Sequence, residues 1–255
     1  MLALPSAAVI VAAVQFEPKL LDVRQNLATA QQLTFEAAAK GARIIVLPEL
    51  CTSGYVFSDL REAAECSQER DGYQTEAFTA IARKFGCHIV FGYPELREGK
   101  LYNSAATVGP SGLTGNSQKH NLWGNDNLWA QPSELQHEVI ITPVGRVGVL
   151  ICRDAMNKYR ESYQFFKPGH KFYTRGSVDT IALLTNWGGS YGYPDSSWVE
   201  LVEETRANVI VSNRVGEERD LKFKGGSCII DRDRRIWTNG SSFTEAAVVG
   251  GMVLL

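Results

Sequence analysis

Three side chains in this sequence could together carry nucleophilic chemistry. Cys152 follows an apolar run, Val147 to Ile151, which is typical of a short buried strand. A second apolar run, Ile44 to Leu47, is closed by a proline and followed by Glu49. Lys119 stands just before an apolar and aromatic pair. Open α/β sheets place reacting groups at the carboxyl ends of their strands, so the three positions favour a common site.

These residue types match the needs of a thiol that attacks a carbonyl or nitrile carbon. The thiol needs a base, for which Glu49 is suited if burial raises its pKa. The developing oxyanion needs a donor, and the ammonium of Lys119 is a strong one. The cation of Arg153, next to Cys152, would favour the thiolate. Taken singly, each residue fits a plain role better, as a buried inert thiol, a solvated carboxylate or a surface lysine, and only their joint occurrence favours a catalytic site.

Further motifs occur in the same order along almost the whole chain, and together they are specific. With the Glu, Lys and Cys positions they resemble the nitrilase, or carbon-nitrogen hydrolase, superfamily in its amidase-like branch. The stretches that carry the resemblance are VAAVQFEP (11–18), PEL (48–50), KHNLW (119–123), GRVGVLIC (145–152), LLTNW (183–187), ETRANVIVSNRVG (204–216) and FKGGSCIID (223–231).

The resemblance implies a role for each matching position. Glu49 would be the general base and acid, Cys152 the nucleophile, and Lys119 with the backbone N–H of Arg153 the oxyanion donors. A second carboxylate that positions the lysine is also implied. Asp126 is preferred for it, although aspartate is one methylene shorter than the usual glutamate, and Glu134 is the other candidate.

Four tryptophans, Trp123, Trp129, Trp187 and Trp198, could line a pocket, although core packing explains most buried aromatics. Trp187 is preferred as a substrate-binding residue because it directly follows an expected strand, Thr180 to Thr185. The turn after the cysteine reads CRDAMNKYRE and lacks the proline that the family often has there. The run that usually ends in Pro-Gly ends here in Pro132-Ser133.

Composition limits the class of protein. The chain has 255 residues, 44% of them hydrophobic, and a formal charge of -2, which suits a single domain over 1–255 and makes a nucleic-acid partner unexpected. Its five cysteines show no C-x-x-C spacing, which favours a reducing, cytoplasmic location over a disulfide framework or a zinc site. The start lacks a basic region and Pro5 interrupts it, so we expect neither a signal peptide nor a membrane span.

The order of expected elements is that of a mixed α/β fold. A strand at 9–16, a helix within 26–40 and the strand 44–47 form a β-α-β unit with parallel strands. A helix at 75–85 and a hairpin of strands at 87–93, 101–108 and beyond follow. The second half has strands near 147–151, 180–185, 209–213, 226–231 and 247–254, with a helix at 198–208. The resemblance implies that these elements form the four-layer α-β-β-α sandwich of the nitrilase superfamily.

The function expected from the resemblance is hydrolysis of a small-molecule amide by water through a cysteine thioester, without a cofactor, in a homodimer or higher oligomer. An N-carbamoyl (ureido) hydrolase, an acyltransferase and a nitrilase are alternatives on the same site, and a non-catalytic binding or scaffold protein is an alternative of another class. The nitrilase is disfavoured because the family's nitrilases have Cys-Trp-Glu where this chain has Cys152-Arg153-Asp154.

One stretch, Asn157 to Ser177, is longer than the usual connection after the cysteine turn. It carries five basic residues against one acid, together with several aromatic residues. We expect it to overhang the pocket and to favour an anionic substrate, or else to form an oligomer contact.

Overall fold

The computed structural model describes residues 8–156, 172–188, 195–238 and 247–254. Its first three elements form the predicted β-α-β unit, with β1 (Ala8–Gln15) parallel to β2 (Ile44–Val46). Helix α1 (Val23–Ala39) connects these two strands in the chain. The Asp22 carboxylate caps its N-terminus by accepting a hydrogen bond from the Gln25 N–H at 3.0 Å.

Two six-stranded sheets make up the body of the protein. The first has the order β14-β1-β2-β3-β4-β5 and the second the order β13-β12-β9-β8-β7-β6. The other strands of the first sheet are β3 (His88–Arg97), β4 (Lys100–Gly109), β5 (Gly112–Gln118) and β14 (Ala247–Leu254). The second sheet consists of β6 (Ile140–Thr142), β7 (Gly145–Ile151), β8 (Thr180–Thr185), β9 (Asn208–Asn213), β12 (Cys228–Ile230) and β13 (Ile236–Thr238).

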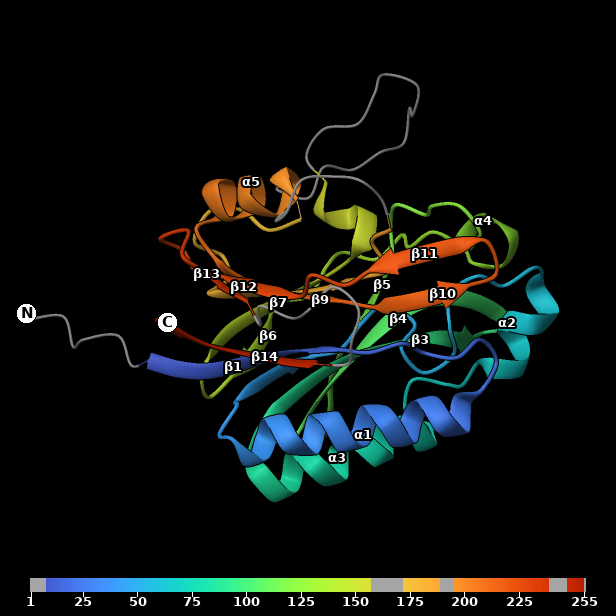
Figure 1. The fold of residues 1–255 in the computed structure, drawn as a ribbon, viewed down its shortest axis with the longest axis horizontal. Helices are drawn as coiled ribbons and strands as arrows, with labels where there is room; N and C mark the ends of the chain where they lie inside the picture. The colour runs from blue at the N-terminus through green and yellow to red at the C-terminus, as the bar shows by residue number, and fades with distance from the viewer. Residues whose placement is uncertain (1–7, 157–171, 189–194, 239–246, 255) are drawn as a thin grey trace, which may run out of the picture.

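The sheets pack face to face, and helices cover their outer faces (Figure 1). Helices α1 and α3 (Tyr73–Phe85) lie on the first sheet, and α5 (Ser196–Thr205) lies on the second. Alternation along β1 shows the layering: Val11 and Ala13 point into the core between the sheets, whereas Ala12 and Val14 point toward the helices. The predicted α-β-β-α sandwich is confirmed.

Most predicted elements are present with shifted ends. The helix expected at 198–208 begins earlier and ends at Thr205, because Arg206 takes a left-handed conformation with φ 59°. The elements not predicted are short: α2 (Leu60–Cys66), α4 (Asp126–Trp129), β6, β13 and the hairpin of β10 (Val215–Glu218) and β11 (Leu221–Lys224).

Candidate active site

Cys152 lies where β7 ends and a short 3-10 turn, Cys152–Ala155, begins. Its φ is +49°, a left-handed conformation that is uncommon for a residue with a side chain. Such a conformation persists only where the surroundings enforce it, which is common at functional sites. Because β7, β8 and β9 are parallel, their carboxyl ends bring Cys152, Asn186 and Asn213 to one edge of the second sheet.

Glu49 reaches the same region from the first sheet. After β2 the chain passes close to Gly92 of β3. A Cβ atom added at Gly92 would lie only 2.4 Å from the Leu50 nitrogen and 2.8 Å from the Glu49 Cα. Only glycine therefore lets the two segments approach this closely. Glu49 is 1% exposed, and its Oε2 atom is buried with no hydrogen-bond partner among the described residues.

Lys119 follows β5 and is held through its backbone on both sides. Its N–H donates to the Asn103 carbonyl at 2.8 Å, and its own carbonyl accepts the Ser133 N–H at 2.9 Å. The fully buried Nζ atom lies 2.6 Å from Glu49 Oε1 and 2.6 Å from Asp126 Oδ2. These two ion pairs use two of the three ammonium hydrogens and leave one for another acceptor.

Asp126, the preferred candidate for the second carboxylate, is fully buried beside the lysine, whereas Glu134 is exposed. The first turn of α4 carries Asp126, and the Trp123 N–H donates to its Oδ2 at 3.0 Å. This short helix brings the aspartate close enough to compensate for its shorter side chain.

Asn103, in the middle of β4, is a site residue that the sequence did not reveal. Its Nδ2 group donates to Glu49 Oε1 at 2.8 Å and to Asp126 Oδ1 at 3.1 Å. The amide therefore separates two carboxylates that would otherwise face each other with a single lysine between them. Little in the sequence singled it out, because the same strand also carries the polar residues Ser104 and Thr107.

The charges of this buried cluster shift the pKa values of its members. Burial raises the pKa of Glu49; Lys119 opposes this shift, and the Asp126 charge adds to it. For Lys119, burial favours the neutral amine, but the Asp126 and Glu49 carboxylates outweigh it and raise its pKa well above the usual value. Lys119 is therefore an ammonium at neutral pH, and Glu49 binds a proton more readily than an ordinary glutamate.

The pKa of the Cys152 thiol is raised by burial and by the Glu49 charge, with Lys119 opposing the shift. The sequence-based expectation that Arg153 would favour the thiolate is wrong. The Arg153 guanidinium instead donates to the Leu122 carbonyl at 2.9 Å and lies 4.7 Å from the centre of the Trp123 ring. At neutral pH the Cys152 side chain is thus a neutral thiol, which would need a base to act as a nucleophile, and the cation that lowers its pKa is Lys119.

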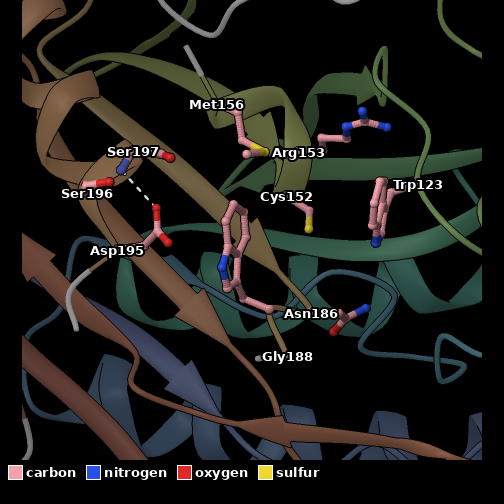
Figure 2. Close-up of a pocket in the computed structure, with 10 residues that line it drawn as sticks. Trp123, Cys152, Arg153, Met156, Asn186, Gly188, Asp195, Ser196 and Ser197 are labelled. Atoms are coloured by element: carbon pink, nitrogen blue, oxygen red, sulfur yellow. Dashed lines mark hydrogen bonds between the residues drawn. The ribbon is translucent and has the colours of Figure 1, made fainter. Parts of the chain in front are cut away.

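Cys152 opens onto a cavity of about 320 Å³ (Figure 2). Trp187, as preferred from the sequence, lines this cavity, and so does Trp123. Trp129 packs in the core against Phe57, and Trp198 packs against Trp187. The remaining lining residues are Arg153, Met156, Asn186, Gly188, Asp195, Ser196 and Ser197.

Asp154 links the cysteine turn to the segment that carries the lysine. Its buried carboxylate accepts the Asn121 N–H at 2.7 Å and the His120 N–H at 3.2 Å. Burial raises the pKa of Asp154 to about 7, although these hydrogen bonds and Lys119 oppose the shift. The positions of Cys152 and Lys119 are therefore coupled through one side chain.

Some sequence-based expectations cannot be judged from the described residues. Most of the stretch from Asn157 to Ser177 lies outside them, and so does its predicted overhang of the pocket.

Across the described ranges, no group of three or more His, Cys, Asp or Glu side chains is arranged to hold a metal ion. Within the same ranges, no helix has the length and apolarity needed to cross a bilayer.

Comparison with known proteins decides the family. The sequence model of the carbon-nitrogen hydrolases matches residues 10–252. The chain belongs to the carbon-nitrogen hydrolase family, within the nitrilase superfamily. This carbon-nitrogen hydrolase is 33% identical to a nitrilase of Pyrococcus abyssi over 92% of its own length and 86% of that protein. It is 27% identical to a protein N-terminal amidase of Schizosaccharomyces pombe, over 86% and 89% of the two chains.

A solved structure has the same fold as this carbon-nitrogen hydrolase. The amidase from Nesterenkonia sp. superimposes with a TM-score of 0.80 at 18% identity, over 100% of this chain and 93% of that one. The fold expected from the sequence is therefore found in an enzyme of the superfamily.

Proposed function

We propose that this carbon-nitrogen hydrolase is an amidase that converts small-molecule amides to carboxylic acids and ammonia. The observation that carries the proposal is the buried Lys119 ammonium, held 2.6 Å from both Glu49 and Asp126 beside the strand-end thiol of Cys152. A lysine buried with two carboxylates leaves the cluster with a net negative charge away from water, which is costly even though the carboxylates stabilise the ammonium. An arrangement this demanding favours a catalytic role over a structural one.

The first half of the proposed reaction forms a thioester. Glu49 Oε2, which has no partner among the described residues, accepts the thiol proton as the Cys152 sulfur attacks the amide carbon. The third N–H of Lys119 and the backbone N–H of Arg153 stabilise the oxyanion. Glu49 then returns the proton to the nitrogen of the breaking C–N bond, so ammonia leaves and the acyl group stays on sulfur.

The second half regenerates the thiol. Glu49 takes a proton from water, the resulting oxygen nucleophile attacks the thioester, and the carboxylic acid leaves. The Cys152 sulfur departs with the electron pair of the C–S bond and recovers the proton from Glu49. One water is consumed for each amide, and no oxidant, reductant or metal takes part in the balance.

A nitrilase is the second candidate, since the relative in Pyrococcus abyssi carries that name. The amidase is favoured by the names of the relative in Schizosaccharomyces pombe and of the structural neighbour from Nesterenkonia sp.. A variant of that neighbour has acrylamide added at its active-site cysteine, which fits an amide held beside a thiol. Ureido compounds as substrates, or an amine in place of water, would use the same thioester chemistry.

An ammonia-release screen tests the proposal. Purified protein is offered small primary amides, ureido compounds and nitriles, with Cys152→Ala and Glu49→Gln as control variants of similar size. We expect release from amides, and a loss of at least about a thousandfold in both variants. Turnover confined to nitriles would replace the amidase by a nitrilase. Ammonia release that both variants retain would remove the mechanism.

A further inference from the structure

The side-chain amide of Asn186 is a buried polar group in the pocket that no described residue satisfies. Asn186 is 7% exposed, yet neither its Nδ2 nor its Oδ1 atom has a hydrogen-bond partner among the residues that the structure describes. A buried amide without partners is costly, and native structures rarely leave one so without a reason. Because Asn186 lines the cavity beside Cys152, its amide is placed to meet a bound molecule.

The backbone directly after Asn186 is held in place by the side chain of Asn213. Asn213 accepts the Trp187 N–H at 2.8 Å and donates from Nδ2 to the Trp187 carbonyl at 3.1 Å. The same Nδ2 group also donates to the Gly225 carbonyl at 2.7 Å. The Asn186 backbone opposes the rise in the pKa of the Cys152 thiol, so Asn186 lies close to the reacting centre.

Two charged side chains that also line the pocket are already engaged elsewhere. Arg153 donates to the Leu122 carbonyl and stacks on Trp123, and Asp195 accepts the Ser197 N–H at 2.8 Å as the cap of α5. In Figure 2, Asn186 lies with Cys152 and Trp123 toward one side of the pocket, and Asp195 lies toward the other.

The proposed mechanism assigns every polar part of a plain amide to another residue. Lys119 and a backbone N–H meet the carbonyl oxygen, and Glu49 serves the nitrogen. Only the acyl part of the substrate is left for Asn186. Its amide offers two N–H donors and an acceptor oxygen, and the buried Trp187 indole N–H, which also has no partner among the described residues, adds a further donor.

We infer that Asn186 is a specificity-determining residue that binds a neutral polar substituent, such as a hydroxyl, next to the carbonyl of the acyl group. This inference rests on the proposed function and names its substrate class as 2-hydroxy amides. Such a pocket discriminates against an acyl group that cannot hydrogen-bond to the buried Asn186 amide. When such a group binds, the amide stays without partners and its burial is costly.

Lactamide and isobutyramide form a matched probe pair, since they differ only by a hydroxyl in place of a methyl group. For the wild-type protein we expect kcat/KM to favour lactamide by roughly 10-fold to 100-fold. Asn186→Leu keeps the size of the side chain and removes its polarity. This variant should lose the preference through slower lactamide turnover, while isobutyramide turnover holds or rises.

Asn116→Leu, the same substitution on β5, serves as the control and should leave the ratio unchanged. A wild-type protein that hydrolyses isobutyramide as well as lactamide would overturn the inference and leave the amidase proposal standing. Equal losses on both amides in Asn186→Leu would also overturn it, since they would assign the residue a purely structural role. Absence of ammonia from every amide would overturn the proposed function and the inference with it.

Discussion

The Nζ atom of Lys119 lies 2.6 Å from Glu49 Oε1, and both side chains are excluded from solvent. They follow different strands of one sheet, β2 and β5, and Cys152, the proposed nucleophile, follows β7 of the other sheet. The proposed base and the proposed oxyanion donor thus form one electrostatic unit before any substrate arrives. Such preorganisation avoids the cost of reorienting solvent during the reaction.

The pH dependence of catalysis should report on Asn103. This residue donates to both Glu49 and Asp126, so its loss makes ionisation of the Glu49 carboxyl harder and raises its pKa further. Because the base must be deprotonated, we expect the acid limb of kcat/KM in Asn103→Leu to move to higher pH by on the order of one unit.

Thr107→Val, on the same strand, is the matched control for Asn103→Leu and should leave the profile in place. The measurement is ammonia release between acid and neutral pH. An acid limb that stays where it is, or moves to lower pH, would contradict the role assigned to Asn103.

Asp154 should make stability depend on pH in an unusual direction. Its pKa is raised from 3.8 to about 7 in the fold, so the native state holds a proton that the unfolded chain has lost. Stability from this group is therefore present at low pH and declines as pH rises from about 4 to about 7. Relative to Asp154→Asn, the wild-type protein should lose on the order of a few kcal/mol across that window.

Urea unfolding of both proteins at about pH 5 and about pH 8 measures this difference. Asp179→Asn is the contrast, because Arg146 lowers the pKa of Asp179 and its contribution is constant over that range. A difference in unfolding free energy between wild type and Asp154→Asn that is the same at both pH values would show that Asp154 is ionised throughout and would contradict the prediction.

The buried pair Arg214 and Glu218 should matter for stability more than any exposed pair. Arg214 is fully buried, bonds the Glu218 carboxylate and donates to the Pro18 carbonyl at 2.9 Å. Glu218 in turn accepts the Tyr55 N–H at 2.7 Å, in the loop that follows Glu49. Arg214→Met leaves that carboxylate without its cation, and we expect it to cost about 3–5 kcal/mol.

Adding Glu218→Gln to Arg214→Met should recover part of that loss, because the double variant no longer buries an unpaired charge. Lys222→Met, in an exposed pair on the neighbouring strand, should cost at most about 1 kcal/mol. Chemical denaturation gives all three values. Equal small effects from Arg214→Met and Lys222→Met would refute the distinction.

The sequence was most informative where an apolar run ends at a chemically reactive residue. Cys152 and Glu49 stand out because their strands are almost wholly apolar, and the preferred residues Asp126 and Trp187 lie where the structure brings the site together. Asn103 could not be found in this way, because its role depends on a strand pairing that joins segments distant in sequence. The Arg153 expectation failed because neighbours in a chain need not point at each other.

Short elements were also missed for a physical reason. The β10–β11 hairpin and α4 are too short for hydrophobic periodicity to exceed chance, and they are stabilised by tertiary contacts. The single-domain organisation, the oligomer and the cytoplasmic location inferred from the sequence stay predictions.

The central claim is that the acyl group of an amide is carried by Cys152. The direct measurement is rapid acid quenching during turnover of the amide that releases ammonia fastest, followed by peptide mapping by mass spectrometry. We expect the peptide containing Cys152 to gain the acyl group as a hydroxylamine-sensitive thioester, and Cys152→Ala to show neither the adduct nor ammonia release. An acyl group on another residue, or undiminished ammonia release by Cys152→Ala, would contradict the account.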